Sequence, residues 1–570
     1  MVIRPVEADQ FEADMDPVFR RILASRGVRS YSETSYPLKN MLAIDEIKYL
    51  DKAAAVLVKH IQQNGRILIF GDYDADGATS TALCVRALSL LGHSNPSYLM
   101  PDRFIDGYGL SLSVADRIVI QKPDCVITVD NGIASFDGIA LLREKGIDVI
   151  VTDHHLPADR LPDASVIVNQ NAWPDQETGK CLAGVGVAFY LMLALRKTLR
   201  AIEWFDGDRP EPNLACCLDL VALGTLADLV PLDYNNRILI NEGLKRIRAG
   251  SCCDGIRALI EMSDKNLVDL TSNDIGFAIA PKINAAGRLD DMTVGVKCLL
   301  SDDYASALQL ARELHDINTH RKHIQQQMSE QAMQKMANFD SPELGTESGI
   351  VLYQEDWHEG VVGIVAAKIK EKYHRPSIVF AMAEDGSLKG SGRSIAGIHL
   401  RDMLDAVDKR QPELIIKFGG HAMAAGLSIE ASALEKFSQS FKQVISDLAD
   451  PSCFNLEAEC DGMLEADYFN LQFAERLQNL SPWGQRFPAP SFIGEFEVLS
   501  WRVLSDKHLK LQLKLPQISE EKFQLLDAIA FFQSDETLNA NYESIHIHYQ
   551  LGVNIYRNQK SLQLLIHDIL

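Results

Sequence analysis

This chain of 570 residues has fewer basic than acidic residues, and it lacks long apolar runs and CxxC cysteine spacings. Its 56 lysines and arginines are outnumbered by 78 aspartates and glutamates, which gives a formal net charge of −22. No apolar run is long enough to span a bilayer, and no basic-then-apolar leader follows Met1. The ten cysteines include no CxxC spacing typical of a zinc or redox site. We therefore expect a cytoplasmic protein with reduced, mostly buried cysteines.

The shortage of basic residues is an argument against binding of nucleic acid. Neutralisation of phosphates by lysine and arginine supplies much of the affinity of nucleic-acid-binding proteins, which usually carry a basic surface. Cations held by some of the acids would cancel part of the negative charge, and a local groove could still bind a strand. The composition therefore disfavours binding over the whole surface and leaves a local site open.

The stretch from Ile67 to Ser80, ILIFGDYDADGATS, is the most informative part of the sequence. Its four leading apolar residues predict a short buried strand, and apolar residues at helical spacing follow from Ala78 onward. Between them lie three closely spaced acids, Asp72, Asp74 and Asp76. Such acids repel one another unless a cation neutralises them. A solvated acidic loop or a helix cap is the alternative for this stretch taken alone.

Two further predicted strands end in polar residues of the same kind. Cys125–Val129 is followed by Asp130, and Val149–Thr152 is followed by Asp153, His154 and His155. In an open α/β sheet the carboxyl ends of the strands meet at one edge, where ligands bind. Carboxylates with a neutral imidazole suit Mn²⁺ or Mg²⁺ better than a structural zinc ion. Asp228, just before Pro231, is the expected closing ligand of a two-metal site able to hydrolyse a phosphodiester.

The rest of the chain predicts further lobes around this site. Residues 182–300 read as mostly helical, with Asn284 and Arg288 in a loop of small residues, and residues 302–338 predict a long polar helix that connects two lobes. The second lobe contains two glycine-rich turns, at residues 390–394 and 419–426. From His508 onward, period-two strands predict a small antiparallel barrel or sandwich. The residues alone therefore indicate a two-metal phosphohydrolase with a two-lobed cleft.

Several strings resemble a known family. DYDADG, VDNG and DHH (Asp153–His155) resemble the DHH phosphoesterase superfamily, and GTLADLVPL, NAAGR, GSGRS and GGHAMAAG resemble its RecJ branch of single-strand-specific 5′→3′ DNA exonucleases. These motifs cover about residues 70–430 in the expected order, and the tail resembles the oligonucleotide-binding (OB) domain of that branch. One position departs from the pyrophosphatase pattern of the superfamily, because Phe70 stands where some members have a histidine.

The resemblance implies an α/β fold class. It would consist of a DHH-type domain with a mostly parallel sheet, a long connecting helix, a second α/β DHH-associated domain and a C-terminal OB-like β-barrel. The corresponding division is an N-terminal extension (1–45), a DHH catalytic domain (46–300), the connecting helix (301–340), a DHH-associated substrate-binding domain (341–450) and an OB-like nucleic-acid-binding domain (451–570).

The resemblance also implies roles for individual residues. The expected metal ligands, for two Mn²⁺ or Mg²⁺ ions, are Asp74, Asp76, Asp130, His154 and Asp228, with Asp72 as a further ligand or a neighbouring acid. His155 would contact the scissile phosphate as a hydrogen-bond donor or acid, and Asp153 would orient the histidines. The expected substrate-binding residues are Arg103, Asn284, Arg288, Ser391, Arg393, Gly420 and His421.

The function that the resemblance implies is metal-dependent 5′→3′ degradation of single-stranded DNA to mononucleotides, in DNA repair and recombination. The protein would be a monomer that works behind a helicase and beside single-strand-binding protein. Two alternatives remain open: a phosphodiesterase for short RNA oligonucleotides or cyclic dinucleotides, and a non-catalytic nucleic-acid-binding scaffold.

The tail would add affinity for the strand. Lys507, Lys510 and Lys514 accompany its predicted strands, and we expect Lys510 and Lys514, on the polar face of their strand, to follow the phosphate backbone. The aromatic residues Phe523, Phe531, Phe532 and Tyr556 are each expected in the core rather than at a base-stacking surface.

Overall fold

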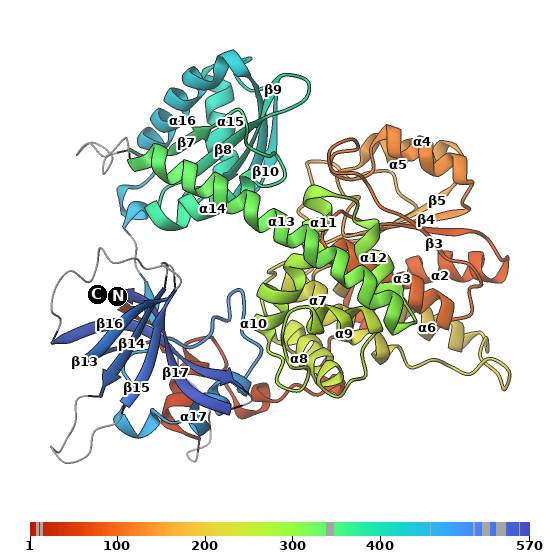
Figure 1. Ribbon diagram of the computed structural model, residues 1–570. Coiled ribbons are helices and arrows are strands. Elements are labelled where there is room, and N and C mark those ends of the chain that lie inside the picture. Colours follow the sequence, from red (N-terminus) through yellow and green to blue (C-terminus); the bar gives the residue numbers. More distant parts are fainter. Residues whose placement is uncertain are drawn as a thin grey trace. The chain divides into compact units, whose positions relative to one another are not determined.

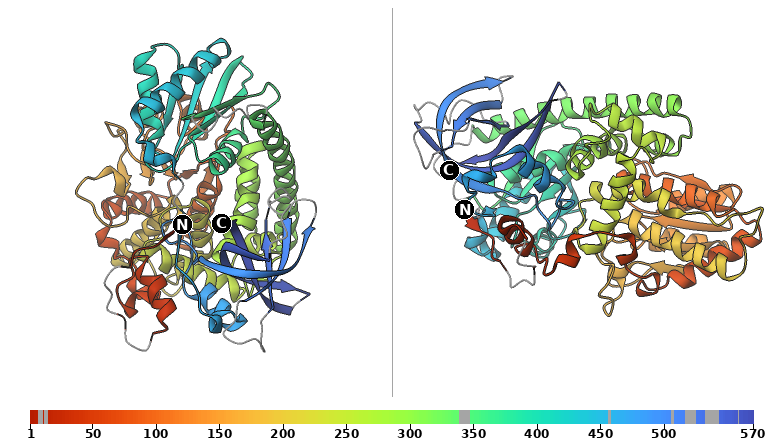
Figure 2. Two further views of the ribbon diagram at one scale, coloured as in Figure 1. Left: turned by 90° about the vertical axis from the view of Figure 1, so that its left-hand side faces the viewer. Right: turned by 90° about the horizontal axis from the view of Figure 1, so that it is seen from below.

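The protein is described here by a computed structural model that covers residues 1–6, 11, 15–337, 347–455, 458–504, 508–515, 525–531, 543–557 and 559–570. Lys507, Phe523 and Phe532 lie outside these ranges, as do residues 338–346, where the connecting helix is expected to end. The chain forms two compact units (Figures 1 and 2). The first contains Met1–Gly287, Asp291–Arg312 and Ala458–Leu570, and the second contains Arg288–Asp290 and Glu313–Glu457. Among the described residues no helix is long and apolar enough to cross a membrane.

A five-stranded parallel sheet organises the first unit. Its strands are β2 (Ile67–Phe70), β3 (Ser97–Leu99), β4 (Cys125–Val129), β5 (Asp148–Thr152) and β6 (Val166–Val168), in the order β3-β2-β4-β5-β6. Figure 1 shows α4 (Leu112–Gln121) and α5 (Phe136–Glu144) on one side and α2 (Leu50–Gln62), α3 (Ala75–Leu90) and α6 (Gly184–Ala201) on the other. Because both faces are covered, the central strands β2 and β4 are buried along their whole length.

Helices follow the sheet in the chain. They are α7 (Leu218–Ala227), α8 (Tyr234–Arg248), α9 (Asp254–Glu261), α10 (Ser272–Asp274), the π-helical η6 (Ile275–Ile279), α11 (Ala280–Leu289) and α12 (Thr293–Leu300). Short 3₁₀ turns are η1 (Tyr31–Thr34), η2 (Leu38–Asn40), η3 (Ile44–Glu46), η4 (Gln170–Ala172) and η5 (Leu214–Cys217).

The loop expected around Asn284 and Arg288 is wrong, because both residues lie on α11. Alanine-rich sequence favours a helix, and Pro281 is tolerated in a first turn. The small residues of α11 allow close packing against a neighbouring segment. A Cβ atom at Gly287 would lie 1.7 Å from the carbonyl oxygen of Tyr73, so α11 packs directly against the acidic turn after β2.

The long polar helix predicted over residues 302–338 is present as α13 (Tyr304–Ala337). Its first residues belong to the first unit and those from Glu313 to the second.

The second unit is built on a mixed sheet with strand order β10-β11-β9-β8-β7. The strands are β7 (Ile350–Tyr353), β8 (Ser377–Met382), β9 (Ser387–Arg393), β10 (Lys417–Gly420) and β11 (Ala424–Glu430), and the helices are α14 (Val362–Tyr373), α15 (Leu400–Arg410) and α16 (Leu434–Leu448), with η8 (Ala431–Ala433) before α16. The two stretches expected as glycine-rich turns are therefore mostly strands. A Cβ atom at Gly390 would lie 2.4 Å from the Phe380 ring, so the glycines make room within the sheet.

The two ends of the chain meet in the first unit (Figure 2). β1 (Val2–Ile3) pairs with β12 (Glu459–Cys460), and the ring of Phe19 on α1 (Pro17–Ala24) stacks on Phe473 of α17 (Leu471–Asn479) at 5.1 Å. Short turns η9 (Pro451–Phe454) and η10 (Ala466–Tyr468) precede α17. The N-terminal extension is thus packed against residues that precede the barrel.

The C-terminal strands close into a five-stranded barrel. They are β13 (Phe492–Leu504), β14 (His508–Lys514), β15 (Leu525–Ala530), β16 (Ser544–Tyr556) and β17 (Gln559–Ile569), in the order β13-β14-β15-β17-β16. The predicted barrel is confirmed, although β15 and β17 pair in parallel rather than antiparallel. Lys510 and Lys514 form ion pairs with Asp527 and Glu497 at 3.1 and 2.7 Å. The core position expected for the aromatic residues is wrong for two of them. Phe531 and Tyr556 are 52% and 65% exposed and are not core residues.

Candidate active site

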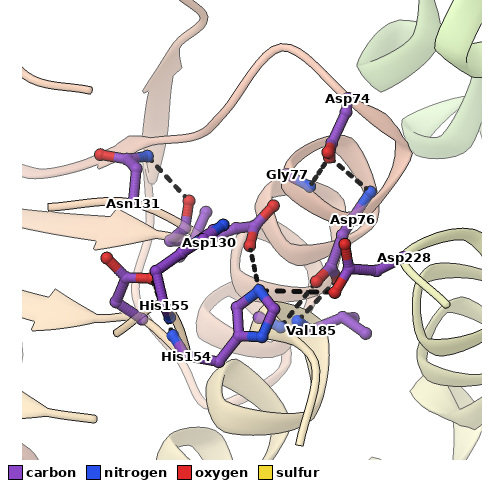
Figure 3. Close-up of polar contacts among 12 residues, drawn as sticks. Asp74, Asp76, Gly77, Asp130, Asn131, His154, His155, Val185 and Asp228 are labelled. Atoms are coloured by element: carbon purple, nitrogen blue, oxygen red, sulfur yellow. Dashed lines mark hydrogen bonds and ion pairs between the residues drawn. The ribbon is translucent and has the colours of Figure 1, made fainter. Parts of the chain in front are cut away.

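Three strands of the parallel sheet deliver acids and histidines to one edge, as their order in the sequence predicted (Figure 3). Asp72, Asp74 and Asp76 follow β2, Asp130 follows β4, and the DHH residues follow β5. Asp74 is also the N-cap of α3, where its carboxylate accepts the backbone N–H groups of Asp76 and Gly77 at 2.9 and 3.0 Å. The acidic turn is therefore fixed in place by the start of the helix.

Asp76 is buried and holds the start of another helix. Its two carboxylate oxygens accept the N–H groups of Gly184 and Val185, at 2.6 and 2.9 Å, where α6 begins (Figure 3). Position 184 has no space for a side chain, because a Cβ atom there would lie 2.6 Å from Cβ of Asp130. α6 thus approaches the sheet edge closely enough to orient Asp76 toward the other acids.

His154 lies between two acids from different parts of the sequence. Its Nε2 atom is 3.1 Å from Oδ1 of Asp130 and 3.5 Å from Oδ2 of Asp228, which caps the C-terminus of α7 (Figure 3). Three sets of residues bring ligand atoms within 4.8 Å of one another: Asp76, His154 and Asp228; Asp72, Asp74 and Asp130; and Asp130, His154 and His155. Asp130 and His154 each occur in two sets, and of the two only Asp130 is a carboxylate, the type of ligand able to bridge two cations.

The electrostatics of this cluster favour bound cations. Burial and the neighbouring carboxylates raise the pKa of Asp76 and of Asp228 to about 7, and raise the pKa of Asp72 and Asp130 well above the ordinary value. Burial and the neighbouring His155 lower the pKa of His154, which favours the neutral imidazole. Oδ1 of Asp72 is buried and accepts no hydrogen bond from any described residue. The oxygen and imidazole donors fit a hard divalent cation.

His155 and Asp153 form a separate pair beside the cluster. Oδ1 of Asp153 lies 2.7 Å from Nδ1 of His155 and accepts the backbone N–H groups of both histidines. Its Oδ2 accepts the N–H of Ile133 at 2.9 Å. Burial opposes ionisation of Asp153, but its hydrogen bonds to His155 lower its pKa overall. Asp153 therefore shapes the DHH turn and fixes the ring of His155.

The structure divides the expected substrate-binding residues between the two units. In the first, the guanidinium of Arg103 lies 4.7 Å from the centre of the Tyr73 ring, and Oδ1 of Asn284 accepts the N–H of Ala75 at 2.8 Å. The side chain of Asn284 therefore supports the acidic turn.

The remaining expected residues lie in the second unit. Arg288 donates from Nη1 to the carbonyl of Gly360 at 3.4 Å, and Arg393 donates from Nη1 to Oγ of Ser391 at 3.1 Å. Gly420 has a positive φ of 142° and ends β10, and His421 lies in the turn that follows. Gly363 lies beside Ser391 and Arg393, where a Cβ atom would approach Oγ of Ser391 to 2.8 Å.

Known proteins resemble the chain over almost its whole length. Family models match residues 66–225 (DHH family, N-terminal domain), 346–447 (DHHA1 domain) and 460–568 (RecJ OB domain). The single-stranded-DNA-specific exonuclease RecJ of Salmonella typhimurium is 48% identical over 573 residues, which cover 100% of this chain and 98% of that protein. The chain belongs to the RecJ family.

Solved structures of RecJ from Thermus thermophilus agree with this assignment. The complex with Mn²⁺ matches with a TM-score of 0.79 and 30% identity, over 97% of this chain and 76% of that one. The complex with Mg²⁺ matches with a TM-score of 0.73 and 29% identity, over 97% and 74%. The fold class expected from the RecJ motifs is therefore confirmed.

Sequence reasoning passed over one residue of this RecJ-family site. The hydroxyl of Tyr108 lies 3.1 Å from Nδ1 of His155. Tyr108 belongs to the same string as Arg103, PDRFIDGYG, where a glycine stands on each side of it. That pair of glycines was the available signal, because it marks a tyrosine held by an unusual backbone.

Proposed function

We propose that this RecJ-family chain is a metal-dependent exonuclease that degrades single-stranded DNA from its 5′ end to mononucleotides. The observation that carries the proposal is the convergence of five aspartates and His154 at one edge of the parallel sheet. A scaffold without activity has no need for such a cluster, whose buried acids repel one another without a cation.

The proposed ligands of two Mn²⁺ or Mg²⁺ ions are Asp72, Asp74, Asp76, Asp130, His154 and Asp228. Bound divalent cations of this kind activate water and stabilise charge during in-line displacement at phosphorus. The protein's own contribution is to hold the ligands rigidly. Asp74 and Asp76 are each fixed by two backbone N–H groups, so little reorganisation is needed when substrate binds.

His155 is the proposed contact to the scissile phosphate. Its Nδ1 is held by Asp153, and Nε2, which lies 3.4 Å from the Tyr108 hydroxyl, is the ring nitrogen proposed to donate to a phosphate oxygen. Arg103 is proposed to bind phosphate from the same unit. Ser391, Arg393 and His421, with Arg288, are proposed to bind the strand from the second unit, because arginine can grip two phosphate oxygens at once.

Family membership also supports a place for the enzyme in DNA repair and recombination. We propose that it works behind a helicase that exposes single strands and beside single-strand-binding protein. The barrel would hold the strand away from the active site, since the outer face of an OB barrel commonly binds oligonucleotides.

Four substrates test the proposal in one assay with Mn²⁺: a 5′-labelled single strand, a 3′-labelled single strand, a blunt duplex and a cyclic dinucleotide. We expect the 5′ label to be released at once as a mononucleotide while the 3′-labelled strand shortens stepwise. The duplex and the dinucleotide should persist. Shortening of the 5′-labelled strand from its 3′ end would contradict the polarity, and faster cleavage of the dinucleotide would assign the enzyme to another substrate class.

A further inference from the structure

The edge of the metal site carries two aromatic rings that the chemistry described above does not use. Tyr73 lies between Asp72 and Asp74 in the acidic turn, and its ring centre is 6.3 Å from that of Tyr108 at an angle of 76°. The ring of Tyr108 in turn meets His155 edge-on, with 5.7 Å between ring centres. Although it is surrounded by these groups, Tyr108 is 48% exposed. Nearly half of the surface of Tyr108 therefore remains accessible to solvent beside the site.

The backbone around Tyr108 is built to hold the ring in this place. Gly107 and Gly109 have φ values of 74° and 76°, in the left-handed region that side chains rarely adopt. A Cβ atom at Gly109 would lie 2.8 Å from Oγ of Ser135, which accepts the N–H of Leu110. The hydroxyl of Tyr108 is held at 3.1 Å from Nδ1 of His155. The position of the ring is thus fixed at both of its ends.

The positive charge of an arginine lies beside these two rings. The guanidinium of Arg103 lies over the ring of Tyr73, 4.7 Å from its centre, so its charge is held next to the acidic turn. A flat apolar face, a nearby guanidinium and a cation site together match the parts of a nucleotide, which has a flat base and a phosphate joined by a sugar.

We propose that the base of the terminal nucleotide stacks on the exposed face of Tyr108 while its phosphate reaches the metal site. The proposal rests on the proposed exonuclease function. Stacking suits an enzyme that must accept all four bases, because every base presents a π-face and none is distinguished by hydrogen bonding. By holding the base, Tyr108 places the first phosphodiester at the cations. Strands whose terminal nucleotide carries a base are therefore cleaved faster than strands with an abasic end.

Paired substrates and paired variants test this role. Two single strands are compared that differ only in the 5′-terminal nucleotide, which carries a base in one and is abasic in the other. For each, kcat/KM is measured for release of the first nucleotide by the wild type, Tyr108→Phe and Tyr108→Leu. Ile120→Ser is the control, because Ile120 is an exposed apolar residue (77%) on α4 outside the aromatic surface. Thermal melting of each variant checks the fold.

We expect the wild type to prefer the strand with the terminal base by about tenfold, which corresponds to roughly 1.4 kcal/mol. Tyr108→Phe keeps the ring and should keep this preference, as should Ile120→Ser. Tyr108→Leu should use both strands equally, at the rate of the abasic one. A Tyr108→Leu enzyme that still prefers the natural end would overturn the proposal.

Failure of the proposed function would look different. If the wild type hydrolysed neither strand, the exonuclease activity would be refuted directly. The stacking contact is then tested by binding: the affinities of the wild type and of Tyr108→Leu for the two strands are measured without divalent cations. A wild-type preference for the strand with the terminal base that Tyr108→Leu loses supports the contact, and equal affinities overturn it.

Discussion

The backbone N–H of Gly184 donates a hydrogen bond of 2.6 Å to Oδ2 of Asp76, so the start of α6 is anchored to a proposed metal ligand. The helix and the metal site therefore share one carboxylate. Asp228 is different. It lies at the end of α7 with 22% of its side chain exposed, and its carboxylate accepts no backbone hydrogen bond from the described residues. The two acids should contribute equally to catalysis and unequally to folding.

Alanine at these two positions tests that difference. Both Asp76→Ala and Asp228→Ala should lower turnover of a single strand at least about hundredfold, or roughly 2.7 kcal/mol in barrier. Without metal, Asp76→Ala should lower the free energy of unfolding by about 1–3 kcal/mol, because two buried N–H groups lose their acceptor. Asp228→Ala should leave it unchanged or raise it, because repulsion is relieved. Urea unfolding in a chelator measures both, and equal losses would contradict the account.

Gly287 offers a test from outside the cluster. Its Cα is so close to the carbonyl of Tyr73 that Gly287→Ala must push α11 away from the acidic turn. Asn284 on the same helix holds the N–H of Ala75, so the ligands of the turn should move as well. We expect activity to fall more than about tenfold and stability by roughly 1–3 kcal/mol.

Gly276→Ala is the matched control for this substitution. A Cβ atom there would meet its nearest neighbour, the carbonyl of Leu226, at an ordinary 3.7 Å. Steady-state kinetics and thermal melting of the two variants should differ clearly. Full activity in Gly287→Ala would show that the acidic turn tolerates displacement.

The pH dependence of stability should reveal the packing of the N-terminal segment. Asp461 binds Arg26 through both oxygens at 2.7 and 2.9 Å, and Oδ2 also accepts Nη1 of Arg4 and the N–H of Ser491. Burial alone would raise the pKa of Asp461, but these partners lower it. A lowered folded pKa means that the stabilisation is present above the unfolded value of about 3.9 and is lost as pH falls through the folded value.

Asp461→Asn should therefore be less stable than wild type by roughly 3 kcal/mol at neutral pH. The gap should narrow as pH falls below about 4. Glu459→Gln is the control, since Glu459 pairs with Arg4 at the exposed surface. Denaturant unfolding between pH 7 and pH 3 measures the curves. A constant gap would show that the Asp461 carboxylate does not titrate with folding.

The barrel is best tested by point substitution. Removal of residues after about 450 would strip β12 and α17 from the N-terminal segment and expose its core. Trp501 is 45% exposed and lines, with Arg502 and Lys510, a hollow of about 400 Å³ across β13, β14 and β15. Trp501→Ala should weaken binding of a long single strand about tenfold and leave turnover at saturation unchanged.

Leu525→Ala is the control for the barrel, because Leu525 is an exposed apolar residue (50%) of β15 that does not line the hollow. Fluorescence anisotropy with long and very short strands separates the contribution of the barrel to binding from that of the active site. Unchanged affinity of Trp501→Ala for the long strand would show that this face of the barrel does not bind DNA.

The strands and the cluster at their ends could be predicted because their signals are local. The four apolar residues Ile67–Phe70 are buried in β2 as expected, and the acids that follow them meet Asp130 because parallel strands end together. The helix around Asn284 was missed because small residues suggest a loop until their neighbour, Tyr73, is known. Tyr108 was missed for a similar reason. Its partner His155 is distant in sequence, and only the fold brings the two together.

The central claim is that the clustered acids hold divalent cations which hydrolyse single-stranded DNA. Release of nucleotides from a labelled single strand should stop in a chelator and return when Mn²⁺ is added in excess. The Asp228→Asn variant, melted and assayed beside the wild type, should fold normally and stay at least about hundredfold slower at the same Mn²⁺ concentration. Hydrolysis that continues in the chelator, or an Asp228→Asn enzyme as fast as wild type, would contradict the account.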